Sequence, residues 1–226
     1  MEPNMSAENQ KESLTQHFVD LHAERERTWP AEQLKKNIDT RAGLVAAYDP
    51  ARHIAVGQTL PAFTLRNVDG GTITRDSLPE GGAVFVFFRF AGCPACNLAL
   101  PYYQRTVWPD LQVRDIALIA VSPQVPEKLI DIKTRHNLEF TVASDTDNRF
   151  GDALGITFAP SDTPDTPPAG WIGELTGTNS WVLPQPTVIV ADSTGRVEFV
   201  EVSPDWLKRT EADAILAATA RVRDAA

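Results

Sequence analysis

The two cysteines of this chain lie three residues apart, as Cys93-Pro94-Ala95-Cys96, between two segments of different character. The segment before them, residues 83–88, is short, apolar and aromatic, and it predicts a buried strand. The segment after them is helical in pattern, and a proline suits the first turn of a helix because its missing N–H needs no partner there. The sequence therefore places a thiol pair where a buried strand gives way to a helix.

This position favours redox chemistry over a structural role for the thiols. The N-terminus of a helix directs free N–H groups and partial positive charge at Cys93, and only the thiolate form of cysteine is a nucleophile. We therefore expect the pKa of Cys93 to lie below the ordinary value of about 8.5. Two inert buried cysteines are an alternative, since free cysteines are often buried.

A structural zinc site is another alternative, and the sequence disfavours it. Such a site needs about four ligands, and the chain has no second C-x-x-C motif. The histidines show no ligand spacing; they are His17, His22, His53 and His136. We accordingly predict neither a metal nor a cofactor.

The acidic balance of the chain limits its partners. The formal net charge is −9, which argues against nucleic acid or an anionic membrane as a partner. No apolar run approaches the ~20 residues of a membrane span, and residues 1–8 are polar and acidic, unlike a signal peptide. We expect a cytoplasmic protein, and in that reducing compartment a C-x-x-C pair is more often catalytic than structural.

The sequence divides into a helical extension, residues 1–54, and an α/β domain, residues 55–226. In the extension, Leu14, Phe18 and Leu21 follow helical spacing and predict a helix that covers the core; a partner-binding arm is the alternative. In the domain, buried strands alternate with helices, and hairpins add antiparallel strands, which predicts an α/β fold with a mixed sheet. The strands are expected within residues 63–74, 83–89, 116–121, 140–143 and 187–200.

Two further segments of the domain carry specific expectations. Residues 156–180 are rich in Pro, Thr, Gly and Asp, and they predict a long insertion or flap in which Trp171 is a local packing anchor. The helix that begins at the cysteines is expected to run to Leu111 with a bend at Pro101.

The order of these elements resembles the thioredoxin fold, and the motifs resemble the peroxiredoxin-like branch of the alkyl hydroperoxide reductase/thiol-specific antioxidant (AhpC/TSA) family. The active-site motif of that branch is similar to Phe87-Phe88-Arg89-Phe90-Ala91-Gly92-Cys93-Pro94-Ala95-Cys96. The resemblance covers about residues 55–222, and its other matching segments are Pro61-Ala62-Phe63-Thr64-Leu65, Val121-Ser122-Pro123-Gln124, Ser144-Asp145, Pro186-Thr187-Val188-Ile189-Val190-Ala191-Asp192 and Val202-Ser203-Pro204-Asp205-Trp206.

The resemblance implies a role for each cysteine. Cys93 matches the peroxidatic cysteine, which attacks a hydroperoxide and becomes a sulfenic acid, and Cys96 would then condense with it to a disulfide. Residues three apart on a helix have Cβ atoms about 5–6 Å apart, whereas a disulfide needs roughly 3.5–4.5 Å, so a modest adjustment closes the bond. The expected partners are a hydroperoxide or disulfide substrate and an external dithiol reductant, thioredoxin-like or glutathione; a homodimer stays open.

The resemblance also implies that Pro186 is a cis proline beside the thiol pair, with an ordinary trans edge proline as the alternative. Three positions depart from the family. Phe90 stands where a threonine or serine is usual, Gly92 where a tryptophan is common, and residues 184–186 lack the arginine that usually precedes the facing strand. The missing hydroxyl and the missing arginine normally help bind and polarise peroxide. Arg89 is the candidate substitute, with a strand-end ion pair as its alternative role.

The sequence therefore leaves three functions open. The first is a peroxiredoxin-like antioxidant peroxidase, which we expect to be slower than efficient peroxiredoxins because two donors are absent. The second is a thioredoxin-like dithiol–disulfide oxidoreductase, which the thiol pair and the missing peroxide-binding groups favour. The third is a redox-sensing interaction module that switches when the disulfide forms.

Overall fold

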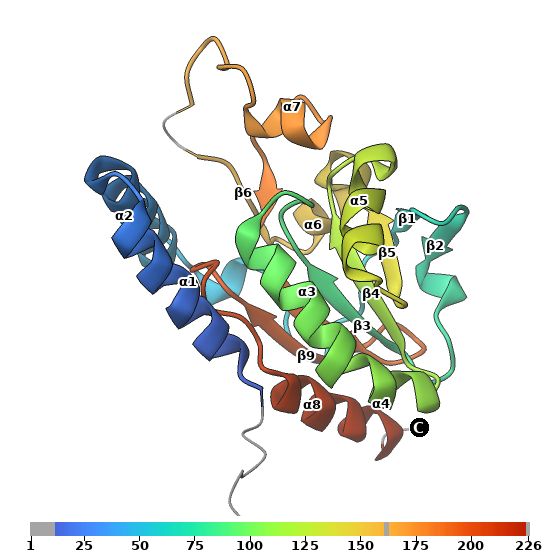
Figure 1. Ribbon diagram of the computed structural model, residues 1–226. Helices are drawn as coiled ribbons and strands as arrows, with labels where there is room; N and C mark the ends of the chain where they lie inside the picture. The colour runs from blue at the N-terminus through green and yellow to red at the C-terminus, as the bar shows by residue number, and fades with distance from the viewer. Residues whose placement is uncertain (1–11, 161–162, 225–226) are drawn as a thin grey trace, which may run out of the picture.

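A seven-stranded mixed sheet forms the centre of the protein (Figure 1). The computed structural model describes residues 12–160 and 163–224, so residues 1–11 of the expected extension lie outside the described residues. Along the sheet the strands follow the order β2-β1-β5-β4-β3-β8-β9. They are β1 (Thr64–Asn67), β2 (Thr72–Thr74), β3 (Ala83–Phe87), β4 (Ala117–Ser122), β5 (Thr141–Ser144), β8 (Thr187–Ala191) and β9 (Val197–Val202).

The middle of this sheet is parallel and its flanks are antiparallel. Strands β3, β4 and β5 run parallel, whereas β8 joins β3, β9 joins β8 and β1 joins β5 in antiparallel pairs. A central parallel strand has both faces covered, which is why β3 is apolar and buried at every position. The predicted α/β class with a mixed sheet is confirmed.

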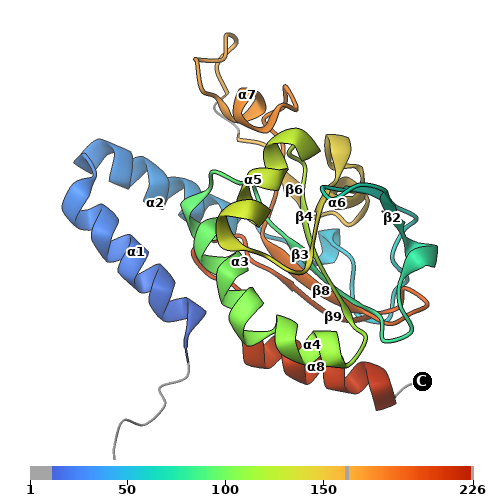
Figure 2. The same ribbon diagram turned by 45° about the vertical axis from the view of Figure 1, so that its right-hand side comes forward.

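Helices pack on the sheet, and most lie on the face that also carries the cysteine helix (Figures 1 and 2). Side chains alternate along β3, so Val84 and Val86 join the core under these helices, while Phe85 and Phe87 join a second core on the opposite face. The helices are α1 (Leu14–Thr28), α2 (Ala31–Ala46), α3 (Pro94–Thr106), α4 (Trp108–Val113), α5 (Pro126–His136), α6 (Arg149–Ala153), α7 (Ile172–Thr176) and α8 (Ala212–Asp224).

Helix α1 packs on the core as the sequence predicts. The Ser13 hydroxyl caps its N-terminus, and Leu14 and Phe18 are buried in the core that contains α3. The views of Figures 1 and 2 agree that α1 runs beside α3 in the opposite direction. Helix α1 is therefore a packed cover, whereas α2 has no buried residue, and the domain boundary at residue 54 stays a prediction.

The expected single helix from the cysteines to Leu111 is wrong. Helix α3 ends at Thr106, and a separate helix, α4, begins at Trp108. Pro109 is the second residue of α4, where its missing N–H breaks no hydrogen bond, whereas inside a continuous helix it would remove one. Pro101, the expected bend, lies within α3.

The expected insertion at residues 156–180 contains secondary structure of its own, although residues 161–162 are not described. Strand β6 (Thr157–Phe158) pairs with β7 (Leu183–Pro184) in a small second sheet, and α7 follows later in the segment. The Trp171 ring packs against the Trp181 ring with centroids 4.7 Å apart. This contact confirms the prediction that Trp171 is a local packing anchor.

Candidate active site

The thiol pair lies at the junction that the sequence predicts. Cys93 is the N-cap of α3 and Pro94 is its first residue. The Cys93 N–H donates to the carbonyl of Phe90 at 3.1 Å, and the Cys93 carbonyl accepts from the backbone N–H groups of Cys96 and Asn97, both at 3.0 Å. The turn that bears the thiols is therefore part of the first turn of the helix.

Both cysteines are reduced and buried. Cys93 is 3% exposed and Cys96 is 0% exposed, and both are free thiols. Of the two, Cys93 lies nearer the surface, between the exposed residues Gly92 and Pro94. Cys93 is therefore the more accessible thiol of the pair.

The two thiols share a hydrogen bond, and this bond shifts their pKa values in opposite directions. The hydrogen bond to Cys96, together with burial, raises the pKa of Cys93 well above its ordinary value. Burial also opposes ionisation of Cys96, but the hydrogen bond from Cys93 and the charge of Arg209 outweigh it and lower the pKa of Cys96 to about 5. The expectation of a lowered pKa at Cys93 is wrong: the pKa of Cys93 is raised, and that of Cys96 is lowered.

Two arginines favour the thiolate form of the pair. The Arg209 guanidinium has Nη2 3.9 Å from the Cys96 sulfur. The positive charge of Arg89 favours the thiolate form of both cysteines. Arg89 places its guanidinium carbon 4.6 Å from the centre of the Trp206 ring, and its Nε is buried without a hydrogen-bond partner among the described residues. The strand-end ion pair weighed for Arg89 is absent from the described part of the chain, where no carboxylate lies in ion-pair contact with it.

The loop between β3 and the cysteines is fixed by buried side chains at the end of β4 and just after it. Gln124 is 4% exposed, and its Oε1 accepts a hydrogen bond from the Ala91 N–H at 2.7 Å. The Ser122 hydroxyl donates to the Arg89 carbonyl at 3.1 Å. These contacts hold the backbone that precedes the thiols.

A second anchor comes from the side chain that follows the cysteines. Asn97 Nδ2 donates to the carbonyls of Ala91, at 2.8 Å, and Cys93, at 2.9 Å. Asn97 Oδ1 accepts from Arg135 Nη1 at 2.9 Å and lies 2.7 Å from His136 Nε2, both on the last turn of α5. Asn97 thus ties the active-site turn to α5.

Two departures from the family pattern are coupled in space. A side chain at Gly92 would begin 2.9 Å from the Phe90 ring, closer than Cβ contacts normally allow. The ring at position 90 therefore occupies the space that a side chain at position 92 would need.

Pro186 differs from expectation. Its peptide bond with Gln185 is trans, since the described residues contain no cis peptide bond. The Gln185 N–H donates to the Ile156 carbonyl at 2.8 Å, which holds this approach to β8 extended. Pro186 lines a narrow crevice with Arg209 and Tyr103, and the arginine reaches the Cys96 sulfur. The predicted cis proline beside the thiols is wrong, and an extended X–Pro bond is trans by default.

Sequence reasoning missed three residues around the thiols, namely Gln124, Asn97 and Arg209, and one buried arginine of α1, Arg25. Gln124 belongs to a segment that was matched to the family, but no local pattern shows that its side chain turns back to the loop. Arg25 had a signal: it continues the spacing of Leu14, Phe18 and Leu21 and so belongs to the buried face of α1. Arg209 comes from a segment 113 residues away from Cys96 in the sequence and had none.

Among the described residues, no group of three or more His, Cys, Asp or Glu side chains is placed to hold a metal ion. No described helix is long and apolar enough to cross a membrane.

Comparison with known proteins assigns the family. The AhpC/TSA family matches residues 56–200. The chain belongs to this family. Among curated relatives, a putative peroxiredoxin bcp of Coxiella burnetii is 28% identical over 103 residues, which is 46% of this chain and 68% of that protein. The thiol-disulfide oxidoreductase ResA of Halalkalibacterium halodurans is 27% identical over 106 residues, 46% of this chain and 59% of that protein.

Solved structures support the fold assignment. Reduced Prx3 of Vibrio vulnificus, in complex with H2O2, is similar with a TM-score of 0.59 and 24% identity, covering 74% of this AhpC/TSA chain and 99% of that one. Peroxidoxin BcpB of Mycobacterium tuberculosis gives a TM-score of 0.57 and 18% identity over 76% and 99% of the two chains. The predictions of the family and of a thioredoxin-like fold are confirmed.

Proposed function

We propose that this AhpC/TSA protein is a thiol-dependent peroxidase that reduces hydroperoxides through Cys93 and Cys96. The observation that carries the proposal is the hydrogen-bonded thiol pair at the N-terminus of α3, which keeps one negative charge beside two arginines. A dithiol that is already singly ionised is ready to attack an electrophilic oxygen. The similarity to a putative peroxiredoxin and to a peroxiredoxin structure solved with H2O2 supports this reaction.

In the first half of the reaction the Cys93 sulfur must carry the negative charge. The proton of Cys93 passes to Cys96 along their hydrogen bond, and the Cys93 thiolate attacks the terminal oxygen of the hydroperoxide. The O–O bond breaks, the alkoxide takes the proton of Cys96 and leaves as an alcohol, and Cys93 becomes a sulfenic acid. In this proposal Arg89 stabilises the charge that develops on the oxygens, which its buried Nε without a hydrogen-bond partner supports.

In the second half of the reaction the two cysteines form a disulfide. The Cys96 thiolate attacks the sulfur of the Cys93 sulfenic acid, an S–S bond forms, and hydroxide leaves. An external thiol reductant, a thioredoxin-like dithiol or glutathione, must then supply two electrons to reopen the disulfide. A homodimer and a cytoplasmic location remain predictions.

Dithiol–disulfide exchange is the second candidate, and specific observations favour it. The position of the usual hydroxyl donor is taken by Phe90, and the chain is similar to ResA over 106 residues. In this reaction the Cys93 thiolate would attack a disulfide sulfur instead of a peroxide oxygen.

Stopped-flow oxidation of the reduced protein separates the two candidates. The protein is mixed with H2O2, with a neutral organic hydroperoxide or with a small neutral disulfide, and the second-order rate constants are compared with those of a free thiol. We expect both hydroperoxides to oxidise the pair faster than the disulfide does. A disulfide rate far above both hydroperoxide rates would replace the peroxidase by the exchange reaction.

A further inference from the structure

The side chain that follows the thiol pair, Asn97, uses every hydrogen-bonding position of its amide. Its Nδ2 donates to the carbonyls of Ala91, at 2.8 Å, and Cys93, at 2.9 Å. Its Oδ1 accepts from Arg135 Nη1 at 2.9 Å and lies 2.7 Å from His136 Nε2. A backbone carbonyl can only accept, so the amide nitrogen must face the active-site turn and the amide oxygen must face α5. The orientation of the amide is therefore fixed from both sides.

Helix α5 supplies two donors to this amide. The Asn97 oxygen can only accept, so His136 Nε2 carries a hydrogen. Burial and the positive charges of Arg135 and Arg105 lower the pKa of His136. The ring is therefore neutral at neutral pH, and its single N–H is the one that donates to Asn97. Arg135 Nη1 also donates to the Ala91 carbonyl at 3.2 Å. We call Asn97, Arg135 and His136 the Asn97 clamp.

The Asn97 clamp holds the backbone at and before Cys93. The Ala91 carbonyl accepts from the clamp, and the Ala91 N–H donates to Gln124 Oε1 at 2.7 Å. The Cys93 carbonyl accepts three hydrogen bonds, one from Asn97 Nδ2 and two from backbone N–H groups in the first turn of α3. A change in the backbone conformation of Cys93 must therefore disturb the clamp.

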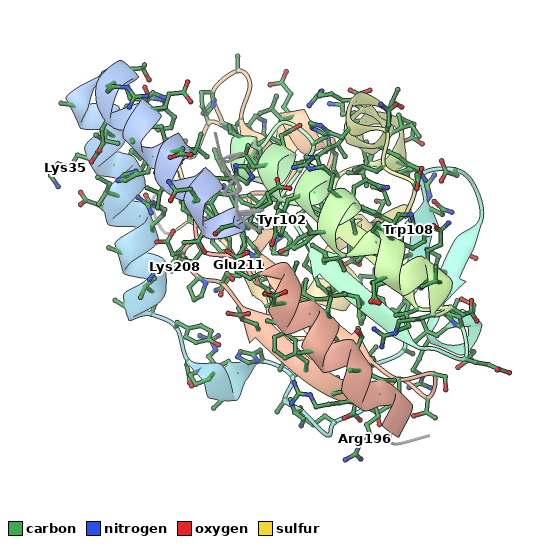
Figure 3. All side chains as sticks on the ribbon, turned by 60° about the horizontal axis from the view of Figure 1, so that its bottom comes forward. Lys35, Tyr102, Trp108, Arg196, Lys208 and Glu211 are labelled. Atoms are coloured by element: carbon green, nitrogen blue, oxygen red, sulfur yellow. The ribbon has the colours of Figure 1, made fainter. Side chains whose placement is uncertain are left out.

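Helix α3 is fastened to the rest of the domain further along. The Tyr102 hydroxyl donates to the Glu211 carboxylate at 2.8 Å, and Figure 3 shows the two labelled side chains next to each other. Glu211 also accepts from the backbone N–H groups of Leu14, at 3.1 Å, and Thr15, at 2.8 Å, where α1 begins. These contacts hold the body of α3 in place when the thiol turn moves.

Disulfide formation requires a movement of the thiol turn. Residues three apart on a helix have Cβ atoms about 5–6 Å apart, whereas a disulfide needs roughly 3.5–4.5 Å. Cys96 lies within α3 and is fully buried, whereas Cys93 is the N-cap, with φ −73° and ψ 120°. The backbone of Cys93 is therefore the part that moves. Both cysteines are free thiols while the contacts of the clamp are formed, so the clamp fits the reduced pair.

We propose that Asn97, oriented by Arg135 and His136, is a positioning residue that favours the dithiol form of the pair and so makes the Cys93–Cys96 disulfide easier to reduce. The proposal deepens the function proposed above and rests on the disulfide that this function forms. In exchange with glutathione, one protein dithiol and one glutathione disulfide give one protein disulfide and two glutathione thiols. Electrons and protons balance in this exchange without a further reactant.

The test measures the equilibrium constant of this exchange in glutathione redox buffers, with the free thiols alkylated and counted by mass spectrometry. The loss of one hydrogen bond changes an equilibrium constant by about fivefold. We expect Asn97→Leu, which removes both donors to the turn, to shift the constant toward the disulfide by about tenfold. His136→Leu and Arg135→Met each remove one donor that orients the amide, and each should shift the constant about three- to fivefold in the same direction.

Matched variants separate the clamp from a general effect on the fold. His136→Gln replaces the imidazole N–H by an amide N–H, and it should keep the constant close to that of wild type. Asp131→Asn changes an exposed charge on α5 and should leave the constant unchanged. Urea unfolding gives a second readout, because Asn97→Leu should destabilise the reduced protein more than the oxidised protein. A contact that only supports the fold would destabilise both forms equally.

Unchanged constants in Asn97→Leu and His136→Leu, or shifts toward the dithiol, would overturn the proposal, and so would equal destabilisation of the two redox forms. If Asn97→Leu does not fold, His136→Leu and Arg135→Met decide, since Arg135 is exposed and His136 is half-buried. None of these measurements uses peroxide. If hydroperoxides are not reduced while the constants shift, the peroxidase proposal fails and the clamp stands. Rapid hydroperoxide reduction with unshifted constants gives the reverse.

Discussion

The Arg209 guanidinium lies 3.9 Å from the sulfur of Cys96, the deeper of the two thiols. This contact explains why a fully buried sulfur carries the negative charge of the pair. Burial alone would keep Cys96 protonated, but a guanidinium and the Cys93 thiol both stabilise the thiolate. These shifts favour the thiolate at Cys96 and the protonated thiol at Cys93.

The first prediction concerns the titration of the pair. With the pKa of Cys96 lowered to about 5 and that of Cys93 raised, the ultraviolet absorbance of the thiolate should report one thiolate that forms as the pH rises through about 5. Cys93→Ala removes the hydrogen bond to Cys96, so the midpoint of the remaining thiol should move to higher pH. A wild-type midpoint at or above the ordinary value of about 8.5 would contradict the shared proton.

The second prediction assigns the nucleophile. Cys93→Ser should abolish peroxide turnover, because the outer sulfur alone meets the substrate. Cys96→Ser should complete one turnover and stop, with Cys93 trapped as a sulfenic acid or a mixed disulfide. Mass spectrometry with a sulfenic-acid probe reads both outcomes. Full turnover by the Cys93→Ser protein would move the nucleophile to Cys96.

The third prediction separates two roles of Arg89. If its unpartnered Nε acts on the peroxide oxygens, Arg89→Met should lower the peroxide rate by about a factor of 10² and affect disulfide exchange much less. The rates are measured well above the pH midpoint of the pair, so that the thiolate population stays constant. Equal losses in both reactions would mean that Arg89 supports only the thiolate or the fold.

Local patterns in the sequence predict most of the elements. Strands such as β3 and β4 are buried on both faces, so their residues are apolar without interruption and are bounded by polar turns. The prediction of one helix with a bend at Pro101 missed the break between α3 and α4. Pro109, the second residue of α4, marks the start of the second helix. Each of these features depends on residues a few positions apart.

The electrostatics of the site could not be predicted in the same way. The helix N-terminus pointed to a lowered pKa at Cys93, but the hydrogen bond between the thiols and the charge of Arg209 depend on contacts between distant segments. The cis form of Pro186 was expected from resemblance alone; the bond is trans, and the Gln185 N–H donates to the Ile156 carbonyl.

The last prediction concerns the anchor of α1. Burial raises the pKa of Glu211, but hydrogen bonds from Thr15, Tyr102 and Leu14 outweigh it and lower the pKa to about 2, from an ordinary value of 4.5. Because the pKa is lower in the folded protein than in the unfolded chain, the ionised carboxylate stabilises the fold fully above about pH 4.5. This stabilisation is lost as the pH falls toward 2.

Glu211→Gln should therefore lower the free energy of unfolding by about 1–3 kcal/mol at neutral pH, the range for hydrogen bonds to a charged group. The difference from wild type should shrink as the pH falls below about 4.5, because the wild-type carboxylate then loses its own charge. Urea unfolding at several pH values measures both effects, and Glu80→Gln at an exposed position is the matched control. A difference that stays constant down to about pH 2, or one that Glu80→Gln reproduces, would show that the Glu211 charge does not hold α1.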